Sequence, residues 1–169
     1  MLRAIAIRST PQGGADPHAQ QISGTAVLQH DERHLRRKAI KLTNGTRVMV
    51  DLPEPVVLTS GDQLVLDNGD VIAIAAADEP LYKVTAHDQS HLVQLAWHIG
   101  NRHLPAAVAT GEILILRDHV IKAMLIGLGA TIDEITAPFN PIRGAYAGHG
   151  SGHHQHDHHH DDHSHHHPD

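Results

Sequence analysis

The stretch LYKVTAHDQSHLVQLAWHIG, residues 81–100, decides the fold of the second half of the chain. Its first six residues have the composition of a strand, and Asp88 then offers a helix N-cap. Apolar residues follow at the spacings i, i+3, i+4 and i+7, which is one face of a helix: Leu92, Leu95, Ala96 and Ile99. Gly100 and Asn101 are a plausible end for this helix.

The residues after this helix predict two more strands, a second helix and a last strand. Short strands are expected at about 106–108 and 113–116, followed by a helix that Asp118 caps and by a last strand near 131–135. The inward residues of this second helix are expected to be Val120 or Ile121, Met124, Leu125 and Leu128. The order strand, helix, strand, strand, helix, strand predicts a ferredoxin-like βαββαβ domain over residues 76–146.

The first half has strand signals without helical periodicity. Candidate strands at 24–28, 47–52, 63–66 and 71–74 are separated by turn sequences such as Asn44-Gly45. Pro53 and Pro55 are compatible with edge or loop positions. The basic cluster of Arg33 and residues 36–38 is interpreted as a solvated loop or strand edge and receives no function. Residues 1–75 are therefore predicted to form a small all-β domain, which makes the whole chain an α+β protein.

Composition excludes several classes of function. A net charge of -6 and 2% aromatic residues argue against nucleic-acid binding. No apolar stretch approaches the roughly 20 residues that a membrane-spanning helix needs, and the start of the chain does not resemble a secretory signal, so we expect no membrane association and a cytoplasmic protein. The chain has 0 cysteines, which leaves imidazole and carboxylate as metal ligands.

Histidine is the unusual residue of this sequence, with 19 copies among 169 residues. Residues 147–169 contain no aliphatic side chain larger than alanine, and we expect them to form a disordered tail. The tail holds eleven of the histidines: His149, His153, His154, His156, His158, His159, His160, His163, His165, His166 and His167.

Such a tail predicts binding of several divalent ions. Unperturbed histidines have a pKa of about 6.5, so most of these rings are neutral donors near pH 7. Together with the interspersed aspartates they suit nickel, copper, zinc or cobalt, and raw affinity favours copper. An engineered purification tag is the alternative, but the longest run is three histidines and aspartates interrupt the series.

Three histidines of the folded part are candidate ligands. His98 and His103 lie five residues apart, about 140° around an ideal helix, so they cannot share an ion on one straight helix. If the helix ends at Gly100, His103 projects from its end as a single ligand, and a symmetric dimer or the tail would supply the others. His98 is closer to an ordinary packed or solvated residue. His119 follows the cap Asp118, where the positive end of a helix favours a neutral ring and a peripheral ligand is possible.

The remaining histidines have no distinguishing spacing and are interpreted as surface or packing residues: His18, His30, His34, His87 and His91.

The run His98-Ile99-Gly100-Asn101-Arg102-His103-Leu104-Pro105, followed by Arg117-Asp118-His119-Val120, resembles the urease accessory nickel metallochaperones. The resemblance extends over nearly the whole chain and implies a cytoplasmic homodimer that binds nickel between its subunits. It also implies transfer of nickel, with an accessory GTPase, to the apo-urease assembly complex. His103 matches the principal interface ligand of that family and His119 an additional ligand of some members, whereas Arg117 stands where some relatives have another histidine.

Two other functions remain open at this stage. A nickel or zinc storage or detoxification protein would need the tail but no structured interface ligand, and a structural adaptor would bind metal only incidentally. A metal-dependent hydrolase is not expected, because catalytic zinc takes three fixed protein ligands and no His-Glu-x-x-His or comparable motif is present. We therefore expect a metal carrier and not an enzyme.

Overall fold

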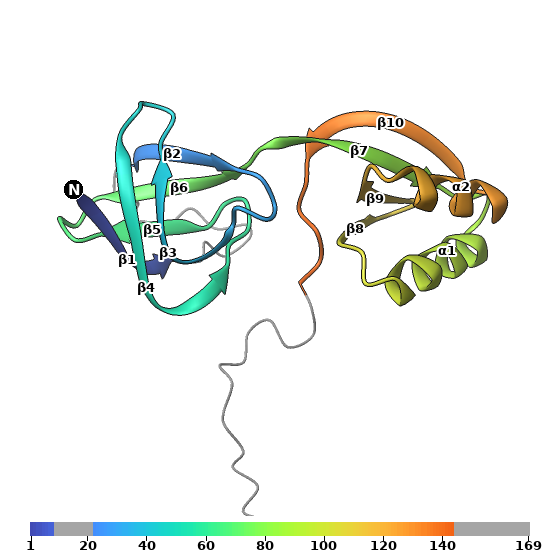
Figure 1. Cartoon of the computed structure of the whole chain (residues 1–169), viewed down its shortest axis with the longest axis horizontal. Coiled ribbons are helices and arrows are strands. Elements are labelled where there is room, and N and C mark those ends of the chain that lie inside the picture. The colour runs from blue at the N-terminus through green and yellow to red at the C-terminus, as the bar shows by residue number, and fades with distance from the viewer. Residues whose placement is uncertain (9–21, 144–169) are drawn as a thin grey trace, which may run out of the picture.

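The computed structural model describes residues 1–8 and 22–143 of the chain, arranged as two sheets and two helices (Figure 1). The first sheet ends at Ala76 and the second begins at Asp78. We call residues 2–76 the first unit and residues 78–138 the second unit. The expected tail, its eleven histidines and His18 lie outside the described residues.

The first unit is all β, as expected. Its strands are β1 (Leu2–Arg8), β2 (Ile22–Leu28), β3 (His34–Lys41), β4 (Arg47–Val57), β5 (Gln63–Leu66) and β6 (Val71–Ala76), in the order β2-β6-β5-β1-β4-β3. The sheet curls so that its two edge strands, β2 and β3, approach each other. Thr43 N, just after β3, donates to Thr25 O in β2 at 2.9 Å. A Cβ at Gly24 would lie 2.8 Å from Leu42 Cδ1, so any larger residue here would displace the buried side chain of Leu42.

Two strands of the first unit were not among the expected ones. β1 lies in the middle of the sheet between β5 and β4, and β3 carries residues 36–38 of the basic cluster, whereas Arg33 lies just before it. Only Leu35 and Ile40 are buried in β3, so it lacks the alternation that identifies a half-buried strand. Pro53 and Pro55 lie within β4, but between the residues that pair with β3 at Asp51 and at Val56, so they interrupt no ladder hydrogen bond.

The second unit has the expected βαββαβ order. Its elements are β7 (Asp78–Thr85), α1 (Gln89–Asn101), β8 (Ala106–Ala109), β9 (Glu112–Leu116), α2 (His119–Gly127) and β10 (Thr131–Pro138). The strands form an antiparallel sheet in the order β10-β7-β9-β8, which is the ferredoxin-like arrangement. α1 and α2 pack on one face, where Leu95, Ile99 and Leu125 join a core with Tyr82 and Ile113.

Both expected helix caps are confirmed. Asp88 accepts from His91 N at 2.7 Å, and Asp118 accepts from Val120 N and Ile121 N at 2.8 and 3.0 Å. The expected inward face of the second helix is confirmed for Leu125, which is fully buried, and for Ile121 and Met124, which pack against the core, and is wrong for Leu128, which is exposed. α2 ends at Gly127 and Leu128 is its C-cap residue, so the helical period no longer directs this side chain inward.

After β10 the chain returns to the junction between the units, in residues 139–143, which we call the return segment. Phe139 is fully buried, Ile142 N donates to Ala106 O at 2.8 Å in the second unit, and Arg143 Nη2 lies 3.3 Å from Asp62 Oδ2 in the first. The return segment is therefore fixed to both units just before the histidine-rich sequence begins.

Among the described residues, neither helix is long and apolar enough to cross a membrane.

Candidate metal centre

His103 follows the end of α1 in a conformation that is rare for its residue type. Its φ is 55°, the only positive φ of a non-glycine residue within the described ranges. The turn is held by hydrogen bonds from Arg102 N to Ile99 O at 3.1 Å and from His103 N to Gly100 O at 2.9 Å. A left-handed residue here ends the helix, and its side chain is exposed to solvent. Non-glycine residues held in this region concentrate at functional sites.

His98 lies in the last turn of α1 and is half-buried. Its ring meets Trp97 edge to face with centroids 5.1 Å apart, and its carbonyl accepts from Arg102 Nη1 at 3.2 Å. His98 is thus within the helix, whereas His103 lies beyond the C-cap. The helix therefore ends between the two histidines, as expected for a helix that stops near Gly100.

The outer face of α1 carries large apolar side chains that nothing in the described chain covers. Val93 and Trp97 are 60% and 63% exposed. They lie four residues apart, so they share one face of the helix. Trp97 is in the last turns of α1, and His103 follows the C-terminal end of this helix. Exposed aromatic residues are enriched at protein interfaces. This surface is a candidate for contact with a second copy of the chain.

The return segment is bonded to the second unit close to His103 along the chain. Ile142 is hydrogen-bonded to Ala106, and Ala106 is three residues from His103, a chain distance of at most about 11 Å. His149 is seven residues beyond Ile142, and seven extended residues span about 24 Å. The chain is therefore long enough for tail imidazoles to reach His103 of the same subunit.

His119 is the first residue of α2 and is exposed. Its neighbour Asp118 is occupied as the cap, and the backbone N–H of Ile121, the main cause, lowers the pKa of this carboxyl group. Arg117 donates to Leu81 O at 3.3 Å and to Ile135 O at 3.0 Å, and so joins β7 to β10. Arg117 therefore has a structural role in the sheet. Because Arg117 is not a histidine, His119 has no second imidazole beside it in the sequence.

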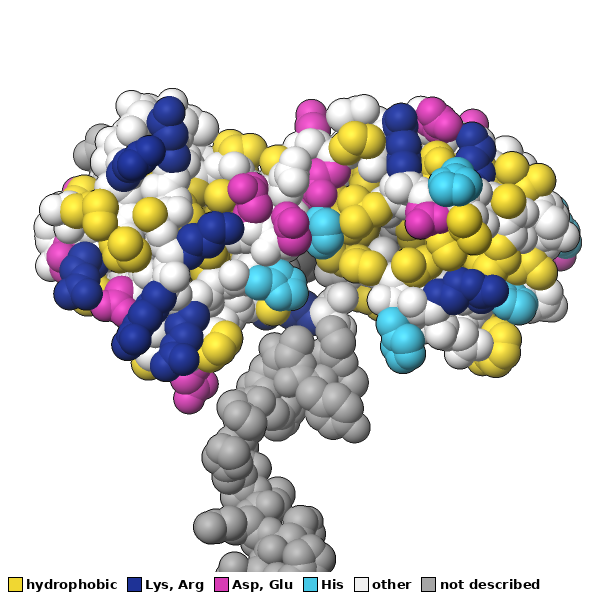
Figure 2. Space-filling model, viewed as in Figure 1, with side chains coloured by type: hydrophobic (Ala, Val, Ile, Leu, Met, Phe, Trp, Pro, Cys, Tyr) yellow, Lys and Arg dark blue, Asp and Glu magenta, His cyan; other side chains and the backbone are white. Residues whose placement is uncertain are grey.

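Within residues 1–8 and 22–143, no group of three or more His, Asp or Glu side chains is placed to hold an ion. Histidine side chains are accordingly spread over the face in Figure 2 and do not gather at one point. An ion held tightly at His103 would need ligands from a second subunit or from the tail.

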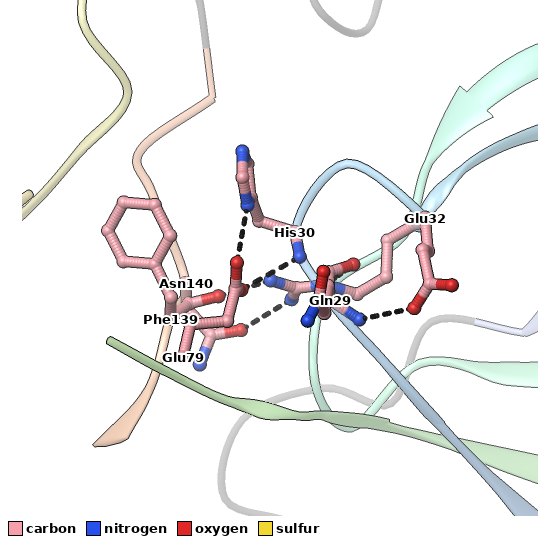
Figure 3. Close-up of polar contacts among 7 residues, drawn as sticks. Gln29, His30, Glu32, Glu79, Phe139 and Asn140 are labelled. Atoms are coloured by element: carbon pink, nitrogen blue, oxygen red, sulfur yellow. Dashed lines mark hydrogen bonds and ion pairs between the residues drawn. The ribbon is translucent and has the colours of Figure 1, made fainter. Parts of the chain in front are cut away.

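Sequence reasoning missed a polar cluster at the junction of the units, drawn in Figure 3. Arg33 is 2% exposed and donates to Asn140 Oδ1 at 2.7 Å and to the carbonyl of Phe139. Burial lowers the pKa of Arg33, and the charge of Glu79 opposes this shift. Glu79, 4% exposed, accepts from both the backbone N–H and Nδ1 of His30, each at 2.9 Å. These contacts join residues 49 to 107 positions apart, and no local sequence signal predicts them.

His91 also has a structural role. It is buried, its Nε2 lies 2.8 Å from Leu128 O, and its Nδ1 accepts from His87 N at 3.3 Å. Both ring nitrogens are occupied, so His91 links the start of α1 to the end of α2 and is not available to a metal.

The architecture defines the chain as an α+β protein with a curled β-sheet unit and a ferredoxin-like unit. Two family models match it: "UreE urease accessory protein, N-terminal domain" over residues 7–77 and "UreE urease accessory protein, C-terminal domain" over residues 79–167.

Individual relatives agree with these matches. Urease accessory protein UreE of Mesorhizobium japonicum is 56% identical over 146 residues, covering 86% of this chain and 72% of the relative. The protein of the same name from Agrobacterium fabrum is 51% identical over 154 residues, covering 91% of this chain and 92% of the relative. The chain belongs to the UreE urease accessory protein family, which confirms the resemblance inferred from residues 98–105 and 117–120.

Proposed function

We propose that the chain is a nickel metallochaperone that binds Ni²⁺ as a homodimer and delivers it to apo-urease during assembly of the urease metal centre. The observation that carries this proposal is His103, an exposed imidazole in a left-handed conformation at the end of α1, in a chain of the UreE family. Strain of this kind is retained where the side chain is needed in one position.

The ligand count supports a homodimer. One His103 supplies one coordination position, and a two-fold axis beside the end of α1 would bring two such rings to one ion. The exposed Val93 and Trp97 on the adjoining helix face give this association an apolar contact surface. His119 and His98 are proposed as peripheral ligands at most.

The proposed site is suited to carrying an ion. Imidazole nitrogen is a ligand for nickel, and zinc or copper would bind the same donors in vitro. A shared and exposed site completed by tail histidines permits release, because a competing ligand can replace the donors one at a time. The proposed recipients are the urease accessory GTPase and the apo-urease assembly complex, in the cytoplasm.

The decisive experiment is a nickel titration by calorimetry with mass determination in parallel. It compares the intact chain, the chain ending at Tyr146, and that truncated chain with His103→Ala. One tight ion per dimer that survives truncation and disappears with His103→Ala supports the chaperone. Binding that disappears with the tail alone would contradict it and favour a nickel or zinc storage protein.

A test in cells separates delivery from binding. A urease-positive strain that carries His103→Ala should lose most urease activity when nickel is limiting and regain it when nickel is in excess. Normal activation of urease under nickel limitation would contradict the chaperone mechanism.

A further inference from the structure

Two positive side chains lie directly opposite each other at the end of the hairpin that β3 and β4 form. Lys41 is the ladder partner of Arg47, and both residues are exposed. Like charges directly opposite on neighbouring strands are destabilising. Within residues 1–8 and 22–143, no carboxylate forms an ion pair with either of them. Residues that function requires are often kept at a cost in stability, so this pair indicates a binding role.

The pair is part of a larger basic surface. Every second side chain of a strand shares a face, so Arg47 and Asp51 of β4 lie on the same side of the sheet. On that side Asp51 accepts from Arg3 Nη2 at 2.7 Å and from Arg37 Nε at 3.1 Å, so one carboxylate serves two guanidinium groups. Figure 2 shows Lys and Arg side chains close together on the first unit. We call these four cations the basic face: Arg3, Arg37, Lys41 and Arg47.

The basic face has an apolar centre. In the ladders, Met49 lies between Arg3 of β1 and Ala39 of β3, and Ala39 is exposed while Met49 is half-buried. Methionine and arginine are enriched where proteins meet, and protein interfaces place polar side chains around an apolar centre. Nucleic acid is a poor match, because the chain has a formal charge of -6 and 2% aromatic residues. The basic face therefore fits the surface of another protein, and its charge requires that surface to be acidic.

We propose that the basic face docks onto an acidic surface of the apo-urease assembly complex. The identity of this partner rests on the proposed function, whereas the chemistry of the contact rests on the four cations and their apolar centre. Complementary charges on two proteins accelerate their encounter and fix its orientation. The basic face lies in the first unit and His103 follows α1 in the second, so docking and ion binding use different units.

The test measures the association rate constant of the full chain with the purified apo-urease assembly complex by biolayer interferometry. The variant is Arg47→Glu, and at about 0.05 M NaCl it should associate about tenfold more slowly than the unsubstituted protein. The difference should largely disappear at about 0.5 M NaCl, because salt screens exposed charges. Arg47→Glu also converts the like-charge pair into an opposite-charge pair, so its unfolding midpoint should rise. Slower association of a more stable variant cannot come from misfolding.

Lys38→Glu is the matched control. Lys38 lies in the same strand as Lys41 and its replacement makes the same change of charge, but its ladder partner is the buried Val50, so it lies on the other face of the sheet. We expect Lys38→Glu to slow association by less than about twofold, since it alters the net charge without altering the basic face. Nickel titration of Arg47→Glu should match that of the unsubstituted protein.

An association rate of Arg47→Glu equal to that of the unsubstituted protein would overturn the docking surface. An equal loss in Lys38→Glu would also overturn it, since the effect would then follow net charge and not the basic face. Loss of binding after nuclease treatment of the complex would overturn it as well, because the ligand would be nucleic acid. These three outcomes leave the chaperone proposal to the nickel titration, whereas a complex that does not bind the unsubstituted protein would contradict both docking and delivery.

Discussion

His103 occupies the position at which many helices place a glycine after the last turn. The sequence motif identified this residue as a candidate ligand, but its spacing alone did not show a left-handed backbone. A side chain in that region is kept at an energetic cost, so stability and ligand function should respond in opposite directions when His103 is replaced.

His103→Gly is expected to increase the free energy of unfolding by about 1 kcal/mol, because glycine adopts the left-handed region without a steric penalty. The same change should remove nickel binding by the chain that ends at Tyr146. His98→Gly is the control, since a glycine within α1 should decrease the free energy of unfolding by about 1 kcal/mol. Urea unfolding and nickel titration measure both effects, and a loss of stability in His103→Gly would contradict the account of its backbone.

His91, unlike His103, contributes to the stability of the fold and not to the proposed metal site. His91→Leu removes both ring hydrogen bonds and leaves the carbonyl of Leu128 without this donor, so the free energy of unfolding should fall by about 1–3 kcal/mol. His87→Gln, at an exposed neighbour, should change it by less than about 0.5 kcal/mol. Equal unfolding midpoints for His91→Leu and the unsubstituted protein would show that this contact is energetically neutral.

At the scale of elements, the second unit was predictable because its signals are local. The apolar period of α1 and the caps Asp88 and Asp118 lie within a few residues of the structures they determine. β3 was missed because its burial has no two-residue period, and β1 because seven residues alone do not show that they will lie in the middle of a sheet.

The cap of α2 should make stability depend on pH. The backbone N–H groups of Ile121 and Val120 stabilise the charged form of Asp118 and lower its pKa. A carboxyl group with a lower pKa in the folded state stabilises the fold fully above its unfolded pKa of about 3.9, and this contribution is lost as the pH falls through the folded pKa.

Asp118→Asn should therefore lower the unfolding midpoint at pH 6 and make less difference at pH 3. Urea unfolding followed by circular dichroism at the two pH values measures this. Asp133→Asn, at an exposed strand position, is the control. A constant difference between Asp118→Asn and the unsubstituted protein at both pH values would contradict a role for the charge.

At the scale of the whole molecule, the relation between the two units depends on contacts that the sequence does not reveal. Arg33 was interpreted as part of a solvated basic cluster, yet it is buried against the return segment. Its three neighbours in that cluster, residues 36–38, are exposed as expected. Arg33 is buried because it donates hydrogen bonds to residues 139 and 140, which are more than a hundred positions away in the sequence.

Arg33→Met is expected to decrease the free energy of unfolding by about 3 kcal/mol, because the carbonyl of Phe139 loses its donor and Glu79 loses a nearby positive charge. It should also separate the unfolding of the two units into two calorimetric transitions. Arg36→Met, on the exposed side of β3, should change the free energy by less than about 0.5 kcal/mol and keep the transition shape of the unsubstituted protein. A single transition of unchanged midpoint in Arg33→Met would contradict a coupling role.

The position of Phe139 has a consequence for how such proteins can diverge. It is the last fully buried residue of the described chain, and the return segment ends four residues later. Insertions, deletions or changes of histidine number beyond residue 143 therefore leave in place the core contacts among residues 1–8 and 22–143. If the C-terminal histidines bind metal as proposed, natural variation can change their number without destabilising the fold. The length of this sequence should then vary more between species than the lengths of the two units.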